Sequence, residues 1–477
     1  MMKVKSSQYL KQVKPLLKSL LDQLLETYSY ASILASDAKS MIYNVSKRGT
    51  TISEDDIFSE RGFVAKVYDG KSYGEYSFNE ISGDLIPAIV EKINKSLMPL
   101  KNLLPSVIHE SEYGKLPDET KQVSDSTEYI ENPEELGDEN IIALLTKLSN
   151  KGKAYSDKIL DCSVSCRYQM YHKIFLSPGK DMEQNVLWTT GSIMVMVSKD
   201  EEVKYAFNGY SNLGGTEILK DMEKDIANVA DNAIALLDSE SITPGEYECI
   251  CTPEVTGMIV HEAFGHGVEM DMFVKKRALA EKYIGEYVAS PLITMHDGAY
   301  GVNEAATFFF DDEGAPANDT IVIDKGILKR GISDAQSAMH LGTLPTGNGR
   351  RQSYERKAYT RMTNTYFEPG TDKLEDMIAS IKYGFLLEDA TSGMEDPKNW
   401  GIQCMVNAAK EIKDGKLTGK IFSPIVLTGY VPDLLKSISM VSDTMKLSGG
   451  GFCGKGYKEW VKVSDGGPYI KAKICLG

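Results

Sequence analysis

Three short turn segments constrain the fold of this chain more than any other feature. They lie at Asp69-Gly70, Asp324 to Gly326 and Asp414-Gly415, and each is flanked by stretches in which apolar and polar residues alternate. Aspartate and glycine between two such stretches are typical of an antiparallel β-hairpin, because glycine readily adopts the positive φ that tight turns need. The sequence therefore predicts one hairpin early in the chain, within Gly62–Phe78, and two in its second half.

Two other segments have the periodicity of amphipathic helices, namely Leu10–Leu25 and about Thr216–Leu237. Pro244-Gly245 follows the second helix and interrupts regular structure, so we place a domain boundary there. The predicted fold class is α+β. Residues 1–240 form an N-terminal α/β domain with helices on a sheet, and residues 241–477 form a C-terminal strand-rich domain that carries the functional site.

The composition and net charge of the chain argue against several classes of function. The 477 residues contain 53 Lys and Arg against 68 Asp and Glu, a net charge of −15, which disfavours binding to nucleic acid or anionic membranes. No apolar run reaches the roughly 18 to 20 residues that span a bilayer, and the N-terminus lacks the apolar core of a signal peptide. Seven scattered cysteines do not suggest a disulfide framework. We expect a cytoplasmic protein, with an acidic surface excursion or linker near residues 110–140.

The segment His261-Glu262-Ala263-Phe264-Gly265-His266 carries the strongest chemical signal. Two imidazoles beside a carboxylate are the parts of a hydrolytic zinc site. Residues five apart point about 140° away from each other in a regular α-helix. We therefore predict a π-type bulge or a break, which Gly265 makes easier. From the spacing alone an alternative stays open, in which one histidine is a core residue and Glu262 a surface charge.

Two histidines leave a catalytic zinc one protein ligand short. Cys453 is the best candidate for the third, because it lies among the glycines of Ser448–Gly456, where the backbone can approach a metal closely. The alternative is a free loop cysteine. The same loop partly matches nucleotide-binding patterns, but glycine occupies the Ser/Thr position of a P-loop and no βαβ unit precedes it, so we expect no nucleotide cofactor. Glu269 and Asp271 are candidates to accept hydrogen bonds from the imidazoles, or else surface charges.

Six segments, in this order, resemble the TldD branch of the TldD/PmbA metallopeptidase family. They are His261–Asp271, Phe310–Pro316, Pro345–Tyr354, Arg361–Gly370, Ile438–Leu447 and Gly451–Gly456. The resemblance covers most of residues 245–477, whereas upstream it is limited to the hairpin within Gly62–Phe78 and the general order of helices and strands. Gly456-Tyr457-Lys458 departs from the acidic and Gly-Gln residues usual in the family at this point.

The resemblance implies one zinc ion per catalytic subunit on His261, His266 and Cys453, with Glu262 as general base. It implies a peptidase that hydrolyses unfolded or flexible peptides by metal-activated water, as a homodimer or as a heterodimer with a TldE/PmbA-like paralogue. Two alternatives remain. A non-catalytic, zinc-stabilised scaffold that binds a protein such as a gyrase would have a closed four-ligand site, and an amidase for a small molecule would not need a wide channel.

Overall fold

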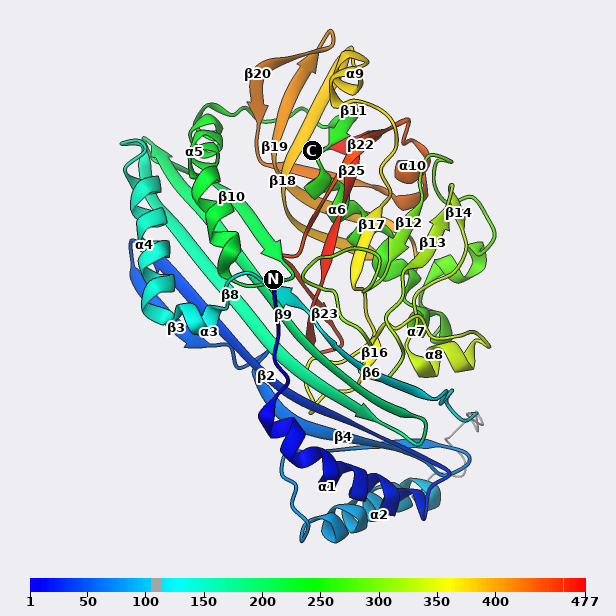
Figure 1. Ribbon diagram of the computed structural model, residues 1–477. Helices are drawn as coiled ribbons and strands as arrows, with labels where there is room; N and C mark the ends of the chain where they lie inside the picture. The colour runs from blue at the N-terminus through cyan, green and yellow to red at the C-terminus, as the bar shows by residue number, and fades with distance from the viewer. Residues whose placement is uncertain (104–113, 458) are drawn as a thin grey trace.

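The computed structural model describes residues 1–103, 114–457 and 459–477, and two large β-sheets divide these residues between them (Figure 1). Strands of the first sheet lie between residues 30 and 212, and strands of the second lie between residues 245 and 476. The fold is α+β, as predicted. The domain boundary near residue 240 stays a prediction. The last strand of the first sheet ends before this point, and the first strand of the second sheet begins after it.

The first sheet has eight strands in the order β10-β9-β8-β2-β4-β5, with β3 paired to β2 and β6 paired to β9. These strands are β2 (Tyr30–Ser46), β3 (Gly49–Glu54), β4 (Glu60–Tyr68), β5 (Tyr73–Phe78), β6 (Lys121–Ser126), β8 (Ile159–Leu176), β9 (Lys180–Lys199) and β10 (Glu202–Asn212). The antiparallel pair β4–β5 is the predicted early hairpin, which is thereby confirmed.

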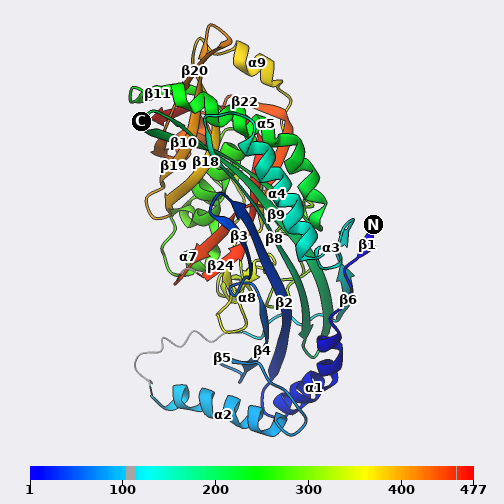
Figure 2. The same ribbon diagram turned by 90° about the vertical axis from the view of Figure 1, so that its left-hand side faces the viewer.

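Helices cover one face of this sheet (Figure 2). They are α1 (Gln8–Leu25), α2 (Ile86–Leu103), α4 (Asp138–Lys153) and α5 (Leu219–Ala235), and α1 and α5 confirm the two predicted helices. Alternate residues of a strand point to opposite faces. In β2, Ile33 packs with α1 and Tyr43 with α4 and α5, whereas Leu34 packs against Phe310 of the C-terminal half. The second face of the sheet therefore meets the functional half of the molecule.

The acidic stretch near 110–140 differs from the prediction in part. Lys121–Ser126 forms β6, which pairs in parallel with β9, and β7 (Glu128–Tyr129) and α3 (Pro133–Leu136) follow. Strand pairing uses backbone groups, so polar side chains can stay in water while the backbone joins a sheet. Composition alone therefore did not reveal this strand. The predicted excursion also includes residues 110–113, which lie outside the described residues.

The second sheet has eleven strands, and five of them close into a barrel, because β11 pairs with both β18 and β25 in the order β11-β18-β19-β21-β25. Its strands are β11 (Gly245–Cys251), β12 (Met295–Asp297), β13 (Thr320–Asp324), β14 (Ile327–Leu328), β17 (Asn364–Phe367), β18 (Tyr383–Asp396), β19 (Gly401–Lys413), β20 (Lys416–Phe422), β21 (Ile425–Tyr430), β22 (Met440–Ser448) and β25 (Ser464–Leu476). The pairs β13–β14 and β19–β20 are the two later hairpins predicted from the sequence, which are confirmed.

Short helices connect the strands of this half, and small two-stranded sheets lie outside both large sheets. The helices are α6 (Pro253–Met258), α7 (Met270–Val274), α8 (Ala335–His340), α9 (Leu374–Ala379) and α10 (Val431–Lys436). Two-stranded sheets are β1 (Met2–Lys3) with β7, β15 (Gly349–Arg350) with β16 (Tyr359–Thr360), and β23 (Phe452–Lys455) with β24 (Glu459–Lys462). Among the helices of the described chain, none combines the length and apolarity needed to cross a bilayer.

Candidate metal centre

The helix α6 changes its winding where the predicted ligands lie. It continues into a π-helical turn, Ile259–Gly265, in which the His266 N–H donates to the His261 carbonyl five residues earlier. This hydrogen bond brings residues five apart to the same face, and it confirms the predicted bulge. A Cβ at Gly265 would lie 2.2 Å from the sulfur of Met362, so the close packing of this turn also requires glycine.

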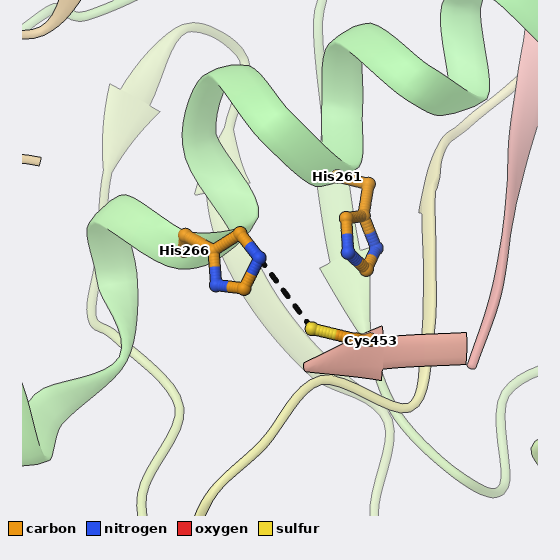
Figure 3. Close-up of side chains that lie close together, drawn as sticks. All are labelled: His261, His266 and Cys453. Atoms are coloured by element: carbon orange, nitrogen blue, oxygen red, sulfur yellow. Dashed lines mark hydrogen bonds between the residues drawn. The ribbon is translucent and has the colours of Figure 1, made fainter. Parts of the chain in front are cut away.

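The structure brings His261, His266 and Cys453 together (Figure 3). Their ligand atoms all lie within 4.8 Å of one another, and Cys453 Sγ is 3.4 Å from His266 Nε2. A tetrahedral zinc ion with ordinary bond lengths needs ligand atoms roughly 3.3 to 3.8 Å apart. Two imidazoles and a thiolate at this spacing therefore fit one zinc ion with little movement.

The chemistry of the donor set also fits a metal. Burial alone would raise the pKa of the Cys453 thiol, but His266 and His261 hold it well below its usual range. A thiolate is the form of cysteine that binds metals. In addition, His261 Nδ1 is buried and has no hydrogen-bond partner among the described residues.

Cys453 is held in place by its own hairpin, β23–β24, and by a buried arginine. The Arg361 guanidinium is 1% exposed and donates to the carbonyl oxygens of Cys453, at 2.5 Å, and Glu459, at 3.0 Å. It thus binds both strands of the hairpin. The motif that contains Arg361 was recognised in the sequence, but its contact with the β23–β24 hairpin could not be predicted from the spacing of residues.

Glu269 and Asp271 occupy different positions around the site. Glu269 Oε2 is 3.4 Å from His266 Nδ1, a long contact for a hydrogen bond, and this carboxylate is only 2% exposed. Asp271 instead accepts hydrogen bonds from Lys455, at 2.7 Å, and Lys275, at 3.1 Å. In this structure Glu269, and not Asp271, is therefore placed to orient an imidazole.

Two further carboxylates near the site were missed by the sequence reasoning. Asp465 Oδ2 of β25 lies 4.0 Å from His261 Nδ1, and burial raises the pKa of Asp465 to about 6. Both side-chain oxygens of Glu395, on β18, are buried without a hydrogen-bond partner in the described chain, and burial raises the pKa of Glu395 well above its usual value. A Cβ at Gly267 would lie 2.7 Å from Glu395 Oε1. Neither residue belongs to a local motif, because each arrives on a distant strand.

Glu262 faces a cavity of about 920 Å³ that lies between the two sheets. The cavity is also lined by both histidines and Cys453, by Asn44 and Arg167 of the first sheet, and by residues 390–393 of β18. Strand β18 packs closely on the side chain of Glu262, since a Cβ at Gly393 would lie 2.4 Å from Glu262 Cγ. The arrangement places a carboxylate and three side chains that could hold a metal ion at the wall of a space large enough for a peptide.

Comparison with known proteins decides the family. Residues 244–474 match the model of the PmbA/TldA metallopeptidase C-terminal domain. A protein of Saccharolobus solfataricus named as a zinc metalloprotease TldD homolog is 30% identical over 327 residues, which are 67% of this chain and 70% of the relative. The chain belongs to the PmbA/TldD metallopeptidase family. A metalloprotease TldD homolog of Buchnera aphidicola subsp. Schizaphis graminum is 35% identical over 250 residues, and the match spans only 51% of that relative's length.

Two solved structures share the fold of this chain. TldE from Thermococcus kodakarensis superimposes with a TM-score of 0.75 at 18% identity, covering 97% of this chain and 99% of the other. A candidate modulator of a DNA gyrase from Thermotoga maritima gives a TM-score of 0.77 at 17% identity, covering 96% and 100%. Both sheets of this PmbA/TldD family member therefore have counterparts in known structures.

Proposed function

We propose that this chain is a zinc-dependent peptidase that hydrolyses unfolded or flexible peptides. In this proposal His261, His266 and Cys453 hold the ion, and Glu262 is the general base. The observation that carries the proposal is the convergence of the three ligand atoms within 4.8 Å at the wall of the 920 Å³ cavity that Glu262 also lines. Within residues 1–103, 114–457 and 459–477, no fourth His, Cys, Asp or Glu joins this cluster, and an open position is typical of catalytic zinc.

The residues of the chain have separate roles in the proposed reaction. When bound, zinc would polarise the carbonyl group of the peptide bond and lower the pKa of water towards about 7. Glu262 accepts a proton from the attacking water as its oxygen bonds to the carbonyl carbon, and then delivers this proton to the amine as the C–N bond breaks. Glu269 accepts from His266 Nδ1, which leaves the Nε2 lone pair directed towards Cys453.

The unpaired edge of β18 supports recognition of a peptide main chain. Within the described structure, β11 pairs with β18 only along Gly384–Leu387, while β19 pairs with the opposite edge as far as Asp396. Residues 390–393 of this strand line the cavity beside Glu262. Pairing of an extended peptide here would give low sequence selectivity, because main-chain hydrogen bonds do not depend on side chains. A peptide complex with side-chain pockets and no strand pairing would contradict this mode.

The competing functions fit less well. A zinc-stabilised scaffold without catalysis is expected to have a closed site with four protein ligands, whereas the cluster described above has three. A small-molecule amidase does not need a cavity of about 920 Å³. Together with the zinc peptidase function, we propose a cytoplasmic location and assembly as a homodimer or with a TldE/PmbA-like paralogue, with no nucleic-acid or membrane partner.

Peptide cleavage and zinc content, measured together, test the proposal. Glu262→Ala should retain zinc and lose at least about 100-fold in turnover, because a general base contributes about 10² to 10⁴. Cys453→Ala should lose both zinc and turnover. Cys475→Ala removes an exposed cysteine far along β25 and should change neither. Full cleavage by Glu262→Ala would exclude the assigned role of this carboxylate.

A further inference from the structure

A second, smaller cavity of about 60 Å³ lies between the first sheet and the β23–β24 hairpin. In the hairpin Phe452 pairs with Lys462 and Cys453 pairs with Val461, so Lys462 and Phe452 point to the face opposite Cys453. Lys462, Trp188 of the first sheet and Arg350 line the small cavity, whereas Phe452 lines the large one. The space exceeds what one water molecule needs, and the described residues that line it include none of the three proposed metal ligands.

Two cations at this cavity have no carboxylate partner. Lys462 is 4% exposed, and within the described residues its Nζ has one hydrogen-bond acceptor, the Gly451 carbonyl at 3.1 Å. The ammonium also lies 4.2 Å from the centre of the Phe452 ring and 4.9 Å from that of Trp188. Arg350 donates to the Met362 carbonyl at 2.6 Å. In the part of the chain that the structure describes, neither cation forms an ion pair, although a buried charge without a counter-charge is costly.

The other charged groups at the cavity are already satisfied, including the carboxylate of Glu60, which accepts a hydrogen bond from the Tyr354 N–H at 2.7 Å. Lys173 pairs with Asp312, and Arg351 pairs with Glu75. Asp311 accepts hydrogen bonds from the backbone N–H groups of residues 313, 315 and 349. Positive charge is therefore in excess at the end of the cavity formed by Lys462 and Arg350.

The surroundings of Lys462 disfavour its charged form. Burial, and then the proximity of Arg167 and Arg350, hold the pKa of Lys462 well below its usual range, although Glu304 and Asp465 act in the opposite direction. Glu304 accepts a hydrogen bond from the Ala305 N–H and makes no ion pair with Lys462 in the described structure. An anion in the cavity would favour the charged form of Lys462, because it would supply a counter-charge.

We propose that this cavity binds one small oxyanion, a carboxylate or phosphate group, between Lys462 and Arg350. Both side chains donate hydrogen bonds, and guanidinium and ammonium groups are the usual partners of such anions. The bound anion would tie the hairpin that carries Cys453 to β15, which carries Arg350. Trp460 lines both cavities, so the anion is either the C-terminal carboxylate of a peptide in the large cavity or a free ion such as inorganic phosphate.

Tryptophan fluorescence of the full-length chain gives a direct test, because Trp188 and Trp460 line the cavity and the chain has three tryptophans. Titration with inorganic phosphate and with acetate should give a saturable signal and a matching rise in Tm. Lys462→Met and Arg350→Met should each weaken binding at least 10-fold. Lys446→Met, which removes an exposed lysine of β22, should bind as the wild type does.

Further experiments identify the source of the anion and test whether its binding is independent of the proposed metal ligands. Binding should persist in Cys453→Ala, because the anion does not use the metal ligands. A short peptide with a free C-terminus and the same peptide with a C-terminal amide are compared for binding to Glu262→Ala. Tighter binding of the free acid would show that the anion is the C-terminal carboxylate of a peptide. Equal binding of the two peptides would show that the anion is a free ion.

Absence of saturable binding of phosphate, acetate and peptide carboxylate by the wild type would overturn the proposal, as would undiminished binding in both Lys462→Met and Arg350→Met. If circular dichroism shows that Lys462→Met does not fold, Arg350→Met and the wild-type titrations decide the question. The readouts do not require peptide cleavage, so failure of this proposal and failure of the proposed peptidase function are distinguishable.

Discussion

Lys455 Nζ lies 2.9 Å from Glu269 Oε2, and this contact joins the hairpin that carries Cys453 to the residues that follow His266. The same ammonium donates to Asp271 Oδ1 at 2.7 Å and to the Thr360 carbonyl at 3.0 Å, so all its protons are used. Burial alone would raise the pKa of Glu269, but Lys455 and His266 lower it to about 2. The carboxylate therefore stays an acceptor for the imidazole, and the three proposed ligands are positioned by protein contacts.

Lys455→Met should weaken zinc binding by about 10- to 100-fold, the usual effect of removing a group that orients metal ligands. Competition with a chelator of known affinity measures the change. The matched control is Lys275→Met, because Lys275 also contacts Asp271 but is placed on the exposed side of it. Equal zinc affinity in the wild type and Lys455→Met would show that the contact with Glu269 is not needed.

Gly393→Ala should reduce turnover by roughly 100-fold, because displacement of a catalytic group by about 1 Å has effects of this size. The new Cβ would lie 2.4 Å from Glu262 Cγ and would push the carboxylate out of place. Gly401→Ala on the neighbouring strand β19 is the control, since nothing lies within 4 Å of its Cβ position. Steady-state peptide cleavage and zinc content together separate a moved base from a lost metal.

Glu75→Gln should lower the free energy of unfolding at pH 7 by about 3 kcal/mol, because it breaks a largely buried ionic network with Lys66 and Arg351. Burial alone would raise the pKa of Glu75, but Lys66 and Arg351 lower it to about 2. The stabilisation is thus fully present above pH 4.5, the ordinary value, and is lost as the pH falls towards 2.

Denaturant unfolding of the wild type and Glu75→Gln, repeated from pH 7 downwards, checks this expectation. The difference between the two proteins should shrink as the solution becomes acidic. Glu91→Gln, which removes an exposed pair with Lys95, should have little effect at any pH. A difference that grows on acidification would contradict the predicted sign.

His296 should stabilise the fold in its charged form. Its Nδ1 lies 3.0 Å from Asp319 and its Nε2 lies 2.9 Å from Glu368. Burial alone would lower the pKa of His296, but these two carboxylates outweigh burial and raise it. The contribution is therefore fully present below pH 6.5 and is lost as the pH rises through the higher folded value. An NMR titration of His296, with His296→Gln as the stability comparison, measures both; a folded pKa below 6.5 would refute the expectation.

The sequence by itself determined the local elements and supplied the residues proposed for the site. Helical periodicity predicted α1 and α5, and Asp-Gly turns between alternating segments predicted three hairpins. The five-residue interval between His261 and His266 predicted the π-helical turn that the structure contains. These features depend on backbone preferences and spacing within a few residues, so they can be read without a partner segment. The β6 strand could not, because its pairing with β9 uses backbone groups while its side chains remain polar.

Only the tertiary structure decided what surrounds the three proposed ligands. Cys453 is 187 residues from His266, and chain topology alone brings its sulfur to the imidazole. Asp465 and Glu395 reach the site on β25 and β18, and Lys455 contacts Glu269, the neighbour of His266, across 186 residues. The physical reason is that burial and charge depend on all neighbours in space, which a linear pattern of residues does not specify.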